Sequence, residues 1–147
     1  MGERRRWFGA RARTRARDVP AELRAAGEAF GVALSAVERA KASLVGVVRS
    51  GRAPGAPLAE ALAGFDVGLA EADAATPAWR TALLDEEWRA CRAGIDQARR
   101  RAERLRLSDG APAAYEELVG VLAELLDPLE PFEGTAVRLR RLGVRVG

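Results

Sequence analysis

The chain has 147 residues, a net charge of +3 and a single cysteine, and it contains no histidine. These features exclude an intrachain disulfide and every catalytic arrangement that depends on histidine. A hydrophobic content of 48% with only 5% aromatic residues indicates a core of Ala, Leu and Val, which is typical of long helices. We therefore expect one all-α domain without a cofactor. The bias towards Arg, Ala and Gly and the lone cysteine favour a bacterial, cytoplasmic protein.

Residues 1–17 form a basic arm that precedes a predicted helical bundle domain over residues 18–147. Seven arginines and one glutamate give the arm a net charge of +6, which leaves −3 on the rest of the chain. We expect the arm to be disordered. Its candidate binding residues are Arg4, Arg5, Arg6, Trp7, Arg11, Arg13, Arg15 and Arg17.

In an extended arm, alternate arginines between residues 11 and 17 fall on one side of the chain, which suits a row of phosphates or anionic lipid head groups. Trp7 is suited to stacking on a base or to insertion at a membrane interface. The sequence therefore predicts binding to nucleic acid or to an anionic membrane surface. A solvated tail without function is the alternative.

The first helix is predicted over about residues 19 to 49, with Asp18 as its N-cap and Pro20 in its first turn. Apolar residues recur along it at seven-residue intervals, a spacing found in coiled coils and in helices with one buried face. They are Leu23, Phe30, Val37 and Leu44. Lys41 lies on the flanking apolar row, so we expect its stem to follow the buried seam while its ammonium group reaches water or Glu38.

A loop rich in Gly and Pro is predicted over residues 50–57, and a second helix with a short apolar stripe follows it. The stripe consists of Leu58, Leu62, Phe65 and Leu69. Two interpretations of Thr76-Pro77 are open: Thr76 caps a new helix that starts at Pro77, or Pro77 only kinks one long helix. Because a new apolar stripe with strict helical spacing begins at residue 84, we favour a break between two helices over one kinked helix.

Each of the first two helices contains a pair of glycines four residues apart, Gly27 with Gly31 and Gly64 with Gly68. In a membrane helix this spacing would indicate dimerisation, but these helices are charged. We expect the glycines to let helices approach one another closely, at a cost of roughly 1 kcal/mol each in helix propensity.

The third helix is expected to be about 30 residues long and to carry a strict apolar stripe. The stripe consists of Leu84, Trp88, Cys91, Ile95, Ala98, Ala102 and Leu105. Because Cys91 lies within this stripe, we interpret it as a core residue and not as a nucleophile. Five arginines between residues 99 and 106 make the end of this helix basic.

Residues 108–112 predict a break, and a fourth helix with an apolar stripe follows it. The stripe consists of Tyr115, Leu118, Leu122, Leu125 and Leu129. Pro128 and Pro131 are expected to end this helix near residues 127–130. A last short helix is predicted over residues 135–142, with Gly143 as its C-terminal stop.

The segment of residues 108–137 contains seven acidic residues and no basic residue. The simplest interpretation is that these acids pair with the arginines that precede and follow them in the sequence. A carboxylate-only metal site is the alternative. Its candidates are Glu124 with Asp127, Glu130 with Glu133, and the run Asp85-Glu86-Glu87. Because prolines interrupt the first group and the stripes place the acids outside the core, we expect no metal site.

Helices with one apolar stripe each and short connections predict an antiparallel bundle of about four helices. The first and third helices are expected to be longer than the others, which would leave parts of their stripes uncovered in a monomer. The first functional hypothesis is therefore a non-enzymatic interaction or scaffold domain that binds a protein partner or a second copy of itself. The alternative is binding to nucleic acid or to an anionic membrane surface through the arm.

Overall fold

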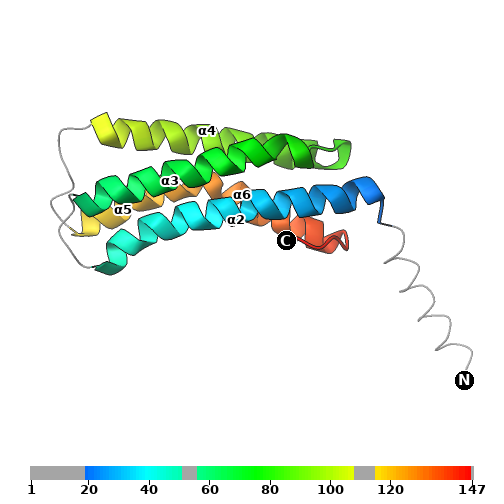
Figure 1. Ribbon diagram of the computed structural model, residues 1–147, viewed down its shortest axis with the longest axis horizontal. Helices are drawn as coiled ribbons and strands as arrows, with labels where there is room; N and C mark the ends of the chain where they lie inside the picture. Colours follow the sequence, from blue (N-terminus) through cyan, green and yellow to red (C-terminus); the bar gives the residue numbers. More distant parts are fainter. Residues whose placement is uncertain (1–18, 51–55, 108–114, 147) are drawn as a thin grey trace, which may run out of the picture.

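The computed structural model describes residues 19–50, 56–107 and 115–146, which form an antiparallel helical bundle (Figure 1). Four rods alternate in direction, and the last of them consists of α5 and α6 lying end to end. The helices are α2 (Ala21–Ser50), α3 (Ala56–Ala75), α4 (Asp85–Leu107), α5 (Tyr115–Leu126) and α6 (Glu130–Arg141). Short 3-10 helices cover Thr76–Trp79, Ala82–Leu84 and Asp127–Leu129. The predicted all-α bundle of about four helices is confirmed.

The core runs along the axis of the bundle and contains a cluster of three aromatic rings. Phe30 of α2 lies edge-on to Trp79 at a centroid distance of 5.0 Å, and it stacks on Phe132 of α6 at 6.0 Å. All three side chains are fully buried. This cluster joins α2 to the α3–α4 connection and to α6, so segments far apart in the sequence share one core.

Helices α2 and α3 approach each other closely because the residues between them are small. A Cβ atom on Gly68 would lie 2.6 Å from the Ala40 Cβ atom and 2.8 Å from the Ala36 carbonyl oxygen. One turn earlier, a Cβ atom on Gly64 would lie 2.7 Å from the Ser43 hydroxyl. The predicted role in close helix approach is therefore confirmed for Gly64 and Gly68, whereas Gly27 faces Val144 in the segment after α6.

The connection between α3 and α4 confirms the predicted break but corrects where the next helix starts. The Thr76 hydroxyl donates back to the Ala72 carbonyl oxygen at 2.8 Å, so Thr76 does not act as an N-cap. After a 3-10 turn the backbone is extended at Arg80 and Thr81, and the α-helix begins only at Asp85. As a result α4 has 23 residues and is shorter than expected.

Burial of one side chain explains this delayed start. Trp79 is fully buried against Phe30, and the 3-10 turn places its indole in the core. The Trp88 indole N–H then donates to the Thr76 carbonyl oxygen at 2.9 Å and ties the first turns of α4 to the end of the turn. Tertiary packing therefore overrides the helix-start signal that Thr76-Pro77 carries.

The fourth rod also differs from the prediction. The helix ends at Leu126 as expected, but α6 begins at Glu130 and not near residue 135, with Pro131 in its first turn. Proline is well tolerated there because the first N–H groups of a helix have no partner within it. The predicted stop is confirmed, since Gly143 has a φ of 81° and the Val144 N–H donates to the Leu139 carbonyl oxygen at 2.9 Å.

Candidate functional site

The eight candidate binding residues of the basic arm, between Arg4 and Arg17, lie outside the described residues, as does the predicted N-cap Asp18. The structure describes the point where the arm joins the bundle. Val19 is buried, and its side chain lies 3.6 Å from the position that a Cβ atom on Gly143 would take. The described part of the chain therefore begins beside the end of α6.

Several of the acidic residues considered as metal ligands pair with basic side chains. In the described segments, no group of three or more Cys, Asp or Glu side chains is placed to hold a metal ion. Asp85 pairs with Arg89 at 3.1 Å and with Arg80 at 3.8 Å, and Glu87 pairs with Arg138 of α6. Asp85 therefore links the start of α4 to the residue Arg80 before it, and Glu87 links α4 to α6.

Cys91 is buried among apolar side chains, as its place in the stripe predicted. Its Sγ atom lies 3.5 Å from the Thr135 hydroxyl, and burial raises the pKa of the thiol from 9.0 to about 11. The thiol is therefore protonated at neutral pH, whereas a cysteine nucleophile requires the thiolate.

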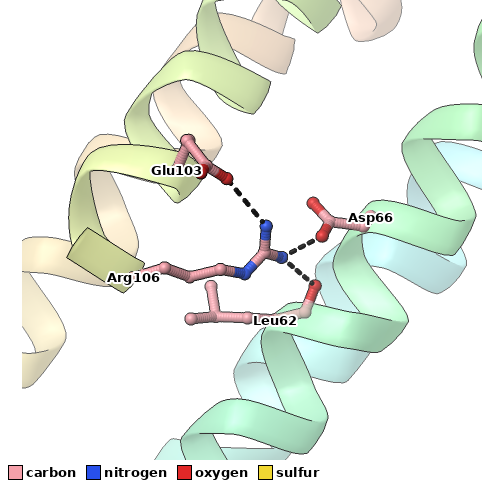
Figure 2. A network of polar contacts seen from close by, with 4 residues as sticks. All are labelled: Leu62, Asp66, Glu103 and Arg106. Atoms are coloured by element: carbon pink, nitrogen blue, oxygen red, sulfur yellow. Dashed lines mark hydrogen bonds and ion pairs between the residues drawn. The ribbon is translucent and has the colours of Figure 1, made fainter.

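The basic end of α4 has different partners from those predicted. Arg106 donates to Asp66 and to the Leu62 carbonyl oxygen of α3, and it lies 3.3 Å from Glu103 on its own helix (Figure 2). Arg99 pairs with Asp73 of α3 at 3.3 Å. These arginines complement acids of α3, and neither pairs with a side chain in the described part of the acidic segment, residues 115–137.

Two basic residues, Arg101 and Lys41, do contact the acidic segment, but neither contact is the predicted ion pair with a nearby arginine in the sequence. Arg101 donates to the backbone carbonyl oxygen of Glu124, not to its carboxylate. Lys41 lies with its ammonium group 3.7 Å from Glu38, as predicted, and 3.5 Å from Glu133 of α6. These charged side chains therefore find partners within the chain, but tertiary packing decides which residues form each pair.

The heptad stripe of α2 is covered within a single chain. Its members Leu23, Phe30, Val37 and Leu44 are each at most 5% exposed. In α4 most of the stripe is buried, and Trp88 and Leu105 are partly buried against the core. The expectation that parts of the long stripes would be left uncovered is therefore wrong, because the other rods lie alongside α2 and cover its stripe (Figure 1).

A different apolar surface lies on the outer side of α2 and α3. Its central row on α3 consists of the exposed residues Ala59, Ala63, Val67, Ala70 and Ala74. Val67 is 59% exposed, and Val32 of α2 is 61% exposed. Val32 lies two turns before Arg39 on the same side of α2, and Arg39 reaches Glu71 of α3 at 2.6 Å. We call this set, the α3 row with Val32, the α2–α3 outer face.

Sequence reasoning missed the α2–α3 outer face, although a signal was present. The α3 row follows helical spacing of three and four residues and contains no charge, just as a core stripe does. The helix has two such stripes on different sides, and only one of them can face the bundle core.

A second surface lies at the end of α6. Arg140 and Arg145 line an open hollow of about 570 Å³ together with Gly143, Val144 and Val146. Arg140, Arg141 and Arg145 are exposed. In the part of the chain that the structure describes, none of these three arginines forms an ion pair with a carboxylate.

Comparison of the chain with protein-family models, with curated proteins and with solved structures finds no match. Among the described helices, none has both the length and the apolar character needed to cross a membrane. Function is therefore inferred from the two surfaces of the molecule, the α2–α3 outer face and the basic end of α6.

Proposed function

We propose that this chain is a non-enzymatic interaction domain that associates with a second copy of itself through the α2–α3 outer face. The observation that carries the proposal is the pair of highly exposed valines, Val32 and Val67, beside a row of exposed alanines on α3. Small side chains allow two helices to approach closely, as they already do between α2 and α3 within the chain. The same packing is available to a second α3.

The charges at the edges of this face suit a copy of the chain. Asp66, Asp73 and Glu71 are each paired with an arginine of a neighbouring helix, so they bring no unpaired charge to the contact. Glu60 lies eleven residues before Glu71, which is about three turns, and so faces the same side. In an antiparallel pair of α3 helices, Glu60 of one copy would come beside the Arg39–Glu71 ion pair of the other, whose charges largely cancel.

Sedimentation equilibrium over a range of protein concentrations tests the proposal. We expect the mass to rise from 15.7 kDa towards twice that value, and Val67→Glu to keep the protein at 15.7 kDa. Val137→Glu is the matched control, because Val137 is 43% exposed on α6, away from this face. A wild-type protein that stays monomeric at millimolar concentration would refute self-association, and loss of association only in the control would assign it to another face.

A second function, binding of the basic arm to nucleic acid or to an anionic membrane surface, is favoured by a separate observation. The arm has a net charge of +6 and joins the bundle at Val19, against Gly143 and next to the exposed arginines of α6. Replacing the seven arm arginines with glutamine is expected to abolish salt-sensitive binding to duplex DNA or to vesicles that contain phosphatidylserine. Unchanged binding by this variant would refute a role for the arm.

A further inference from the structure

The end of α6 holds its arginines in a defined arrangement. Gly143 adopts a φ of 81°, which turns the chain back so that the Val144 N–H bonds to the Leu139 carbonyl oxygen at 2.9 Å. Val144 is buried against Gly27 of α2, where a Cβ atom would also lie 2.8 Å from the Arg145 carbonyl oxygen. The reversal is therefore anchored to the bundle, and Arg140 and Arg145 line one hollow.

The arginines in this part of the molecule fall into two groups. Arg138 is committed to the fold, because it bonds to Glu87 and donates to the Leu83 carbonyl oxygen at 3.1 Å. Arg140, Arg141 and Arg145 are exposed and make no ion pair with any described carboxylate. Guanidinium groups bind phosphate oxygens through two parallel hydrogen bonds, so they suit a ligand that carries phosphate groups.

We infer that Arg140, Arg141 and Arg145 form a phosphate-binding site for the backbone of duplex nucleic acid. The inference rests on the second proposed function, which is binding through the basic arm, and adds these three arginines of the bundle as further binding residues. Val19, the first described residue, lies 3.6 Å from the position that a Cβ atom on Gly143 would take, and the seven arginines of the arm precede it in the sequence. A duplex presents one phosphate charge for about every 1.7 Å of its axis and can therefore engage both parts.

Exposed acidic residues of α2 near Gly27 favour a narrow polyanion over a membrane. Glu22 and Glu28 are exposed on α2 on either side of Gly27, the glycine that Val144 covers. A flat anionic bilayer pressed against this end of the bundle would also meet those carboxylates and be repelled by them. A nucleic-acid backbone can follow the arginines of α6 and the arm without lying over α2.

Fluorescence anisotropy of a labelled DNA duplex, measured across a salt series with the full-length chain, tests the site. The first variant replaces Arg140, Arg141 and Arg145 with glutamine. The matched control replaces Arg49, Arg100 and Arg104, which are exposed arginines of α2 and α4, and so removes the same charge elsewhere. A third variant replaces the seven arm arginines with glutamine.

We expect the α6 variant to lower the slope of log affinity against log salt by about 2.7, because each phosphate contact contributes about 0.9. A fourfold rise in salt should then weaken the wild type about 40-fold more than this variant. The matched control should keep the wild-type slope.

Each other outcome has a definite meaning. An α6 variant with the wild-type slope, alongside an arm variant that loses binding, would overturn the inference and leave the arm proposal standing. Loss in the α6 variant with no loss in the arm variant would refute the arm and support the α6 site. If the wild type binds only vesicles that contain phosphatidylserine, or binds neither ligand, the inference fails.

Discussion

Gly94→Ala tests the contact between α4 and the middle of the fourth rod, where α5 meets α6. Gly94 is buried in the middle of α4, directly against the turn that joins α5 to α6. A Cβ atom at this position would overlap the Pro128 carbonyl oxygen and lie 3.1 Å from its carbonyl carbon. Because these are backbone atoms of a buried turn, no side-chain rotation relieves the overlap.

The expected net effect of Gly94→Ala follows from two opposing contributions. Replacing a helical glycine with alanine adds about 1 kcal/mol of helix propensity. Forcing an extra methyl group into a packed interior costs about 1–3 kcal/mol, and contact with backbone puts this site at the upper end of the range. We therefore expect the free energy of unfolding to fall by about 2 kcal/mol.

Gly134→Ala is the matched control, because Gly134 is an exposed glycine within α6 and a Cβ atom there would meet nothing within 4 Å. It should gain about 1 kcal/mol, which raises the midpoint of thermal unfolding by about 3 °C in a chain of this size. Urea and thermal unfolding of both variants give the comparison. If Gly94→Ala were as stable as the control, the close contact with Pro128 would be refuted.

Three further predictions concern the core. Phe30→Ala removes the ring that contacts Trp79 and Phe132, so urea unfolding should show a loss of about 3–5 kcal/mol, and a loss below 1 kcal/mol would contradict the described cluster. Cys91 should react with a thiol reagent at pH 8 only after unfolding in urea, because its thiol is buried and protonated. The raised pKa of Cys91 also predicts that the free energy of unfolding falls by at most about 3 kcal/mol as pH rises from 9 to 11, because the thiol loses its proton first in the unfolded state. Cys91→Ala should remove this part of the pH dependence. An unchanged pH profile in this variant would contradict the raised pKa.

The sequence by itself determined which residues pack inside most of the bundle. The seven-residue spacing of Leu23 to Leu44 and the glycine pairs on α2 and α3 act through helix geometry, which is local. Gly143 could likewise be predicted as a stop, because only the backbone freedom of glycine is needed at a φ of 81°. These features require no knowledge of what lies across the core.

Only the tertiary structure decided where α4 and α6 begin, which acids the arginines meet and which side of α3 faces outward. Trp79 is drawn into the core by Phe30, 49 residues earlier, and this delays α4 to Asp85. The α3 row around Val67 has the same apolar spacing as a buried stripe, and its exposure depends on where α2 and α4 pack. Contacts between residues far apart in the sequence set each of these outcomes, whereas the periodicity of a single helix carries information about its own faces alone.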